Sequence, residues 1–119
     1  MMEPYTTSKL AMAAGISVHI VRDYVVRGLV HPVRRTPGGH GLYDHRMLAR
    51  LRLVWALFEA GIDLDELAPL CQALDADGDA TEILANLRLQ LETRRQRLAA
   101  VDRQIATMMS AQDEEHLYG

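Results

Sequence analysis

The sequence of 119 residues is 49% apolar but only 5% aromatic, which indicates one compact domain, alone or with an extended appendage, around an aliphatic core. No stretch approaches the roughly 18 consecutive apolar residues of a membrane span, and the first residues lack the pattern of a signal peptide, so no membrane association is expected. The single cysteine, Cys71, excludes an intrachain disulfide and is typical of a cytoplasmic protein. The net charge of −3 divides into +5 over residues 1–52 and −8 over residues 53–119; the basic half suits a polyanionic partner, although such a split can also arise by chance.

The N-terminal region predicts two short helices joined by a tight turn. Thr6 and Thr7 are candidate N-caps for a helix over SKLAMAA, and Gly15 follows it, where many helices end in the left-handed conformation. Ser17 is the candidate N-cap of a second helix over VHIVRDYVVR, which ends at Gly28. A helix, a short glycine-containing turn and a second helix are typical of a helix-turn-helix.

The segment HPVRRTPGGHGLYD predicts a short two-stranded hairpin, or wing. Its central Pro-Gly-Gly favours a turn, because proline cannot continue a helix and glycine permits positive φ. Val33 and basic residues precede the turn, and Leu42 and Tyr43 follow it.

Two further helices are expected after the wing. Asp44 is the candidate N-cap of a helix over HRMLARLRLVWALFEA, which ends at Gly61. The apolar residues of this helix recur at steps of three and four and are expected to face the core: Met47, Leu48, Leu51, Val54, Trp55 and Phe58. Asp63 is the candidate N-cap of a helix over LDELAPLCQAL, in which Pro69 predicts a kink or an early end.

Residues 81–111 contain neither glycine nor proline and carry an apolar heptad repeat. Its a and d positions, seven of the eight apolar, are Leu84, Leu87, Leu91, Arg94, Leu98, Val101, Ile105 and Met108. The repeat predicts a coiled-coil dimerisation helix. The alternative, a helix folded back on its own domain, is disfavoured because about 45 Å of helix outreaches so small a domain. Arg94 at a d position favours antiparallel pairing, or a contact with an acid such as Glu92 of the partner.

The second helix of the helix-turn-helix is the expected DNA-reading element, because the N-terminal turn of such a helix reaches base edges in the major groove. The candidates for base contacts are Ser17, Val18, His19 and Arg22. The candidates for phosphate contacts are Arg22, Tyr24 and Arg27 on the helix and Arg34 and Arg35 in the wing. A single arginine could be an ordinary solvated charge, but this clustering favours an interface with double-stranded DNA.

The sequence does not favour an enzyme. Its five histidines follow no metal-ligand or catalytic spacing, and Cys71 is expected to be a small buried residue of the fourth helix. Asp63, Asp65 and Glu66 suit a helix N-terminus rather than a catalytic pair. We therefore predict no catalytic residues, no metal site and no cofactor.

Nearly the whole chain resembles the MerR family of transcription regulators. YTTSKLAMAAGISVHIVRDYVVRGLVHPVRRTPGGHGLYD looks like that family's DNA-binding head, and LARLRLVWALFEAGIDLDELAPL looks like its next two helices. The resemblance implies a mainly α fold, in which a winged helix-turn-helix head carries a long C-terminal helix that forms an antiparallel coiled coil. It also implies homodimers that bind promoter DNA and distort it.

The sequence departs from the family pattern at three places. Asp23 stands where the family usually has an aromatic residue, and a carboxylate repels phosphates. Gly41 stands where the family wing usually carries an arginine, which removes a phosphate contact. The ends of the long helix lack the cysteines of mercury-sensing members, so no thiolate site for a soft metal is expected.

Within the family, SVHIVRDY, the GGxG wing and FEAGIDLDELAPLCQALDADG resemble a small co-regulator encoded with mercury-resistance genes. This likeness implies a dimer that binds the operator of a mercury-resistance operon and lowers expression by antagonising the metal-sensing activator. The alternative is a modulator that acts mainly in a complex with a MerR-type activator rather than by direct DNA binding. We expect a DNA-binding head over residues 1–75, a coiled-coil helix over 80–111 and a flexible acidic tail over 112–119.

Overall fold

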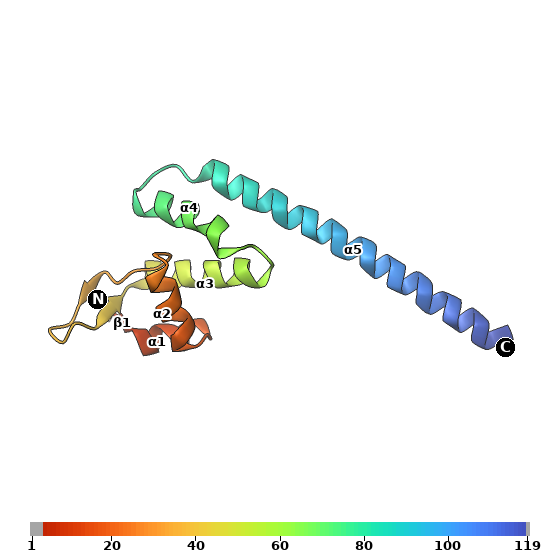
Figure 1. Cartoon of the computed structure of the whole chain (residues 1–119), viewed down its shortest axis with the longest axis horizontal. Coiled ribbons are helices and arrows are strands. Elements are labelled where there is room, and N and C mark those ends of the chain that lie inside the picture. The colour runs from red at the N-terminus through yellow and green to blue at the C-terminus, as the bar shows by residue number, and fades with distance from the viewer. Residues whose placement is uncertain (1–3, 119) are drawn as a thin grey trace. The chain divides into compact units, whose positions relative to one another are not determined.

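The computed structural model describes residues 4–118, which form two compact units: a head that ends at Ala80, and a single long helix (Figure 1). The elements, in chain order, are β1 (Tyr5–Thr6), α1 (Thr7–Ala14), α2 (Val18–Val26), β2 (Arg34–Arg35), β3 (Gly41–Tyr43), α3 (His45–Glu59), α4 (Leu64–Asp75) and α5 (Thr81–Tyr118). The predicted fold class, a mainly α head with a helix-turn-helix and a wing followed by a long helix, is confirmed. No helix within residues 4–118 combines the length and the hydropathy that crossing a membrane requires.

Side-chain caps and one left-handed glycine set the helix-turn-helix. The Thr6 hydroxyl accepts a hydrogen bond of 3.2 Å from the first turn of α1, so Thr6 rather than Thr7 is the cap. The Ser17 hydroxyl accepts one of 3.1 Å from the first turn of α2. Between them Gly15 has φ 72°, a left-handed backbone conformation that would be strained for a residue with a side chain. These local interactions fix where both helices begin and where α1 ends.

The wing belongs to a three-stranded antiparallel sheet in the order β1-β3-β2. The expected hairpin is present, with Arg34 opposite Leu42, and its turn closes through a 2.8 Å bond from the Thr36 N–H to the His40 carbonyl. The third strand was not predicted, because β1 is two residues long and its pairing of Tyr5 with Tyr43 is distant in sequence. This pairing ties the start of the chain to the wing.

Helix α3 begins as predicted but presents a slightly different face to the core. The Asp44 carboxylate accepts a 3.0 Å bond from the Met47 N–H and caps the helix. The predicted Met47, Leu48, Leu51 and Val54 are buried, whereas Trp55 is half-buried and Phe58 is 43% exposed. Leu57 is buried in place of Phe58. Steps of three and four both keep a residue on one helix face, and only packing selects between them.

Helix α4 corrects two expectations. Asp63 occupies the N-cap position, but its side chain makes no capping hydrogen bond. The helix also continues through Pro69 to Asp75, so an early end at the proline is wrong. Proline removes one backbone hydrogen bond of the helix, and Leu67 and Leu70, both almost fully buried, hold the helix against the core despite that loss.

Helix α5 has 38 residues, a length of about 57 Å at 1.5 Å per residue. It reaches Tyr118 and thus includes residues 112–118, for which a flexible tail was expected. Glutamine, glutamate and leucine favour helix there, and no proline or glycine interrupts it before position 119. Of the heptad residues, Leu87 is buried and Leu91 and Arg94 are half-buried, and the exposed ones are Leu84, Leu98, Val101, Ile105 and Met108.

Candidate nucleic-acid interface

The exposed face of α2 is a stripe formed by His19, Arg22 and Val26. These residues are three and four positions apart, so they share one side of the helix, and Val21 on the opposite side is buried. Ser17 lies exposed at the N-terminal end of this stripe, and Val18 is half-buried. The structure therefore gathers most of the predicted base-contacting residues on one accessible surface.

Val26 is a residue of this face that the sequence analysis missed. Its side chain is 86% exposed although it is apolar and lies within the recognition helix. An apolar side chain on a DNA-reading surface can contact the methyl group of thymine. The step of seven residues from His19 was the available signal, because it returns to the same face of a helix.

Tyr24 is a correction to the predicted phosphate contacts. Its side chain is only 2% exposed, and its hydroxyl is buried and has no hydrogen-bond partner among the residues described. Burial, with a smaller effect of the Asp23 carboxylate, raises the pKa of this hydroxyl, so it stays protonated. The periodicity of α2 turns Tyr24 to the same side as Val21, and in this structure it cannot reach a phosphate.

Arg27 is exposed, but its charge is already engaged. The Arg27 Nε donates to the Asp23 Oδ2 at 2.9 Å, one helical turn away. The ion pair is half-exposed and therefore weak, but it partly neutralises an arginine that would otherwise face phosphates. Asp23 thus reduces the positive charge of α2 in two ways, by its own charge and by its hold on Arg27.

Asp23 also lines a cavity of about 380 Å³ in the head. The rings of Trp55 and Phe58, with centroids 5.9 Å apart, line the same cavity. A short carboxylate leaves open a space beside these rings that a larger side chain at position 23 could occupy. The cavity thus lies at the position where the resemblance implies an aromatic residue.

The two wing arginines are both exposed, as an interface with DNA requires. The Arg35 Nη1 donates to the Gly39 carbonyl at 3.2 Å, which holds this guanidinium beside the hairpin turn. Gly41 faces them on β3, and a Cβ there would lie 3.1 Å from both the Pro32 Cβ and the Tyr43 hydroxyl. An arginine at position 41 would therefore need its neighbours to shift.

An ionic network around the buried Arg50 of the head was not visible in the sequence. Arg50 is 7% exposed, and its Nη1 donates to the Asp75 Oδ1 at 2.6 Å and to the Leu29 carbonyl at 3.5 Å. His31 Nε2 lies 2.8 Å from the same Asp75 oxygen. Burial alone would raise the pKa of Asp75, but the hydrogen bonds from His31 and Arg50 outweigh burial and lower it. This network joins α3, the end of α4 and the segment after α2.

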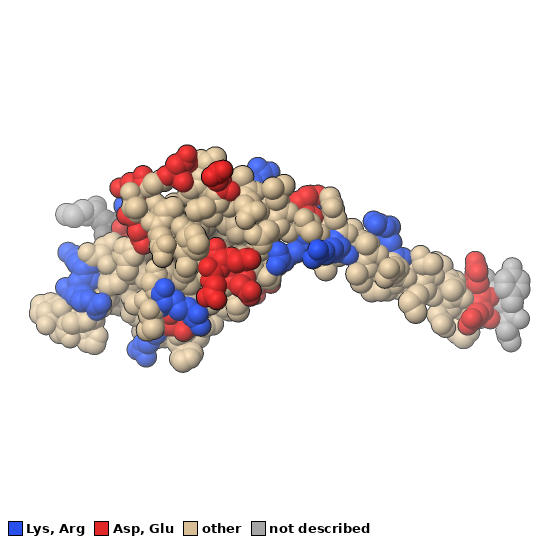
Figure 2. All heavy atoms as spheres, turned by 45° about the horizontal axis from the view of Figure 1, so that its top comes forward, with Lys and Arg blue, Asp and Glu red and all other residues tan. Residues whose placement is uncertain are grey.

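The basic charge available to DNA is thus smaller than the sequence count suggests. Arg50 is buried in the network, Arg52 Nη2 donates to the Ala13 carbonyl at 3.0 Å, and Arg27 is paired. Figure 2 shows basic side chains at the end of the head that carries the hairpin, whereas acidic side chains gather over the part that carries α4. In this view the basic side chains of the head lie in separate groups rather than in one continuous patch.

Cys71 is buried, and burial raises the pKa of its thiol. Deprotonation is therefore disfavoured, and the thiolate is the form that binds metals. Within residues 4–118, no three His, Cys, Asp or Glu side chains are grouped so as to hold a metal ion.

Comparison with known proteins gives consistent results. The model of the MerR HTH family regulatory proteins matches residues 5–74. The chain is 59% identical over 109 residues to the HTH-type transcriptional regulator MerD of Acinetobacter calcoaceticus, a match that covers 90% of each chain. It is 54% identical over 116 residues to MerD of Shigella flexneri, covering 96% of this chain and 97% of that protein.

Solved structures share the fold as well. HiNmlR, a MerR family regulator lacking the sensor domain and bound to promoter DNA, is 25% identical with a TM-score of 0.72, covering 86% of this chain and 78% of that one. The N-terminal part of the Bacillus subtilis multidrug transporter activator Mta is also 25% identical, with a TM-score of 0.59, covering 88% and 97%. The predicted family is confirmed: the chain belongs to the MerR family of helix-turn-helix transcription regulators, which are DNA-binding proteins and not enzymes, and it is similar to MerD.

Proposed function

We propose that the chain is a dimeric down-regulator of a mercury-resistance operon, which binds the operator and antagonises the metal-sensing activator in the cytoplasm. The observation that carries this proposal is the exposed stripe of His19, Arg22 and Val26 on α2, in a chain that is more than half identical to MerD proteins. Ser17 and Val18 extend the base-reading surface, and Arg34 and Arg35 add phosphate contacts from the wing.

The exposed apolar residues of α5 support dimerisation, and a dimer suits a regulator of this kind because two heads can read two half-sites. The exposed apolar residues of α5 follow the heptad repeat from Leu98 to Met108. A lone helix that exposes such a seam to water gains stability when a second helix covers it. The proposed partner is a second copy in antiparallel orientation.

The proposal includes no mercury site in this protein. Its only cysteine, Cys71, lies in the core of the head with a raised pKa, which disfavours the thiolate that a soft metal needs. Regulation would therefore follow the abundance of the protein, or its partners, rather than direct sensing of Hg(II).

The test is footprinting on a mercury-resistance promoter with and without its MerR-type activator. We expect salt-sensitive protection of the operator and a lower occupancy by the activator when this protein is added. Arg22→Ala should weaken binding by about tenfold, since a lost DNA contact costs ~1–3 kcal/mol, whereas Arg103→Ala on α5 should not. Absence of specific protection at low salt would contradict direct DNA binding.

A second candidate is a modulator that acts through a complex with the MerR-type activator. The Asp23–Arg27 ion pair favours this second function, because the pair weakens the electrostatic attraction between α2 and DNA phosphates. Co-purification with the activator, with and without DNA, separates the two functions. A complex without DNA supports the second function, and its absence under both conditions removes it.

A further inference from the structure

The cavity beside Asp23, the head cavity, lies between three helices of the head. Its volume of about 380 Å³ falls within the range of small-molecule sites, roughly 300–1,000 Å³. The residues of the lining that matter here come from α2, α3 and the start of α4, and they are Asp23, Arg27, Trp55, Phe58 and Leu64. Walls from three helices can hold a small organic ligand on several sides.

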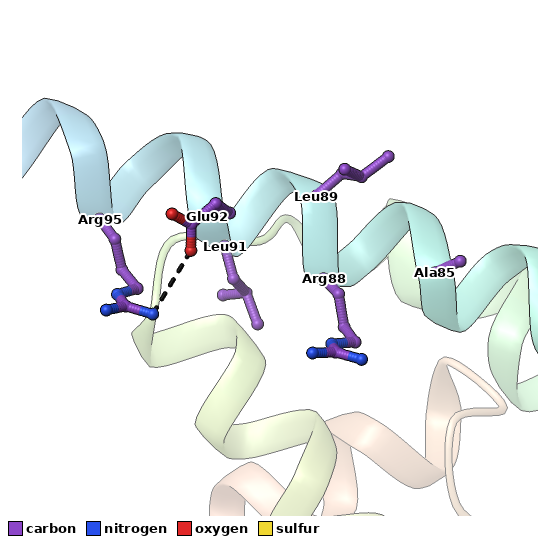
Figure 3. Close-up of a pocket in the computed structure, with 6 residues that line it drawn as sticks. All are labelled: Ala85, Arg88, Leu89, Leu91, Glu92 and Arg95. Atoms are coloured by element: carbon purple, nitrogen blue, oxygen red, sulfur yellow. Dashed lines mark hydrogen bonds and ion pairs between the residues drawn. The ribbon is translucent and has the colours of Figure 1, made fainter.

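A larger cavity, of about 650 Å³, lies along α5, and the residues that line it all belong to that one helix (Figure 3). Arg88, Leu91 and Arg95 point to one side of α5, while Leu89 points to the other. Side chains of a single helix provide one wall and do not surround a ligand. The head cavity is therefore the better candidate for a binding site.

Two aromatic rings form an apolar wall of the head cavity. The ring centroids of Trp55 and Phe58 lie 5.9 Å apart, and the ring planes are tilted by 35°. Both rings remain accessible, since Trp55 is half-buried and Phe58 is exposed. The faces of such rings stack with flat groups and attract cations. This wall thus fits a ligand with a flat body.

The charges near the head cavity favour a cation. Burial is the main cause of the raised pKa of the Tyr24 hydroxyl, and the carboxylates of Asp23 and Glu59 raise it further. The guanidinium of Arg27 acts in the opposite direction. Two carboxylates and one guanidinium therefore act on this hydroxyl, which leaves an excess of one negative charge around it.

The ion pair with Arg27 leaves the Asp23 carboxylate open to exchange. The pair is half-exposed, so replacing Arg27 by another cation costs little. The carboxylate has about four lone-pair sites, and Arg27 Nε occupies one of them on Oδ2. An amidinium or guanidinium group can bind a carboxylate through two parallel hydrogen bonds. Such a group on a ligand can therefore compete with Arg27.

Tyr24 adds an unsatisfied polar group to the lining of the head cavity. Its side chain is 2% exposed, and its hydroxyl has no hydrogen-bond partner among residues 4–118. Buried hydroxyls in proteins nearly always have a partner, so one that lacks it is a place where a bound molecule can supply the hydrogen bond.

We infer that the head cavity binds a small aromatic cation, such as an aryl amidine, and that this ligand strengthens operator binding. The ring lies against Trp55 and Phe58, and the cationic group replaces Arg27 on the Asp23 carboxylate. The released Arg27 is then available to DNA phosphates. His19 lines the cavity and belongs to the exposed stripe of α2, so the site borders the DNA-reading face. The effect on DNA rests on the proposed function, whereas ligand binding does not.

Trp55 is the only tryptophan of the chain, so its fluorescence reports binding directly. Benzamidine, benzamide and benzoate carry the same ring with a cationic, a neutral and an anionic substituent, and they form a matched series of probes. Benzamidine should change the Trp55 emission of the full-length chain at millimolar concentrations, as expected of so small a ligand. Its affinity should exceed that of the other two by about tenfold, because only the cation forms a charge-assisted pair with Asp23. Equal responses to all three probes, or none, would overturn the inference.

Two variants locate the site. Asp23→Asn removes the charge and keeps the shape of the cavity, so it should weaken benzamidine binding by about tenfold and leave benzamide binding unchanged. Asp23→Tyr fills the space beside the rings and should abolish the response to all three probes. Asp102→Asn, on α5, removes the same charge outside the cavity and is the matched control. Unchanged benzamidine binding by Asp23→Asn overturns the inference even if Asp23→Tyr fails to fold.

A second measurement tests the effect on DNA. In fluorescence anisotropy at constant chloride concentration, saturating benzamidine should tighten operator binding by about three- to tenfold, because it neutralises Asp23 and releases Arg27. Arg27→Ala should still bind benzamidine but should gain less operator affinity from it. An equal gain in this variant would mean that benzamidine acts by another route, and would overturn the role of Arg27.

The outcomes separate this inference from the proposed function. Benzamidine binding that depends on Asp23, in a chain that binds no operator, supports the site and overturns direct DNA binding. Operator binding that does not respond to an occupied cavity overturns the coupling to DNA alone. Operator binding by a chain that takes up no benzamidine overturns this inference and leaves the proposed function standing.

Discussion

The head and α5 differ in how far their apolar side chains are buried. In the head, Leu10, Leu51 and Leu67 have no exposed surface. On α5, Leu98 is 70% exposed and Ile105 and Met108 are more than half exposed. The head thus covers its apolar side chains, whereas the part of α5 from Leu98 to Met108 leaves an apolar seam exposed, which another molecule could cover.

Removal of apolar side chains from the heptad seam of α5 should give the largest change in free energy. It should weaken dimerisation and leave the stability of the head unchanged. Leu98→Ala changes both copies of the central layers, so we expect dimerisation to weaken by about 4 kcal/mol, at ~2 kcal/mol or more for each lost leucine. Leu89→Ala is a matched control, because Leu89 is 68% exposed but lies at an f position. Analytical ultracentrifugation measures the dimer, and the fluorescence of Trp55 reports the head. Equal effects of the two variants would contradict the heptad assignment.

The ionic network around Arg50 provides a corresponding test of the stability of the head. Asp75→Asn leaves the buried guanidinium of Arg50 without its carboxylate, so we expect the head to lose about 2 kcal/mol of its free energy of unfolding, less than for a fully buried pair because the Asp75 side chain is 34% exposed. Asp77→Asn is the control, because this residue lies outside the network and its positive φ of 52° suits asparagine. Denaturant unfolding followed by Trp55 fluorescence measures both.

The pH dependence of this stabilisation follows from the lowered pKa of Asp75. A carboxylate whose pKa is lower in the folded state stabilises the fold above its unfolded pKa, about 3.9, and loses that contribution as the pH falls through the folded value. The difference between the unchanged chain and Asp75→Asn should therefore be full at neutral pH and shrink below about pH 4. A difference that persists unchanged at acid pH would show that the variant acts through packing instead.

A smaller change in free energy is expected when the charge of α2 is altered, and it should appear in the affinity for operator DNA. Asp23→Asn removes one negative charge and releases Arg27, so operator binding should tighten by about three- to tenfold, with a salt slope steeper by about one. In an Arg27→Ala background the same change should gain less, because no arginine is released. Fluorescence anisotropy over a salt series measures affinity and slope together. An unchanged slope would mean that Arg27 stays away from phosphates.

The smallest effect concerns Tyr24. Because its hydroxyl is buried without a partner among the described residues, Tyr24→Phe should leave the head equally stable or more stable by up to about 1 kcal/mol. Operator affinity should not change, since the hydroxyl is out of reach of phosphates. A marked loss of affinity at unchanged stability would restore Tyr24 as a phosphate contact.

Local signals predicted most of the head correctly. Thr6, Ser17 and Asp44 cap helices where hydroxyl and carboxylate side chains before apolar periodic segments indicated caps. Such signals act within three or four residues and need no knowledge of the rest of the fold. The positive φ of Gly15 at the end of α1 is likewise a local feature that the sequence predicted.

Structural features that depend on contacts between distant segments were missed by the sequence analysis or predicted wrongly. Strand β1 pairs with residues almost 40 positions away, and Arg50 meets Asp75 from another helix. The exposure of Val26 and the burial of Tyr24 depend on which side of α2 packs against the head. The crowding at Gly41 depends on Pro32 and Tyr43. Apart from the seven-residue step from His19 to Val26, none of these features leaves a pattern within a short window of sequence.

The sequence by itself determined the helix-turn-helix, the wing, the family and the heptad seam, because caps, turns and periodicity are local. Only the tertiary structure decided which arginines remain available to DNA, since Arg50 and Arg52 are held by groups that folding brings to them. It also decided that Tyr24 lies inside and that Val26 lies outside. The physical reason is the same in each case: burial and ion pairing are properties of neighbours in space, which the order of residues alone does not specify.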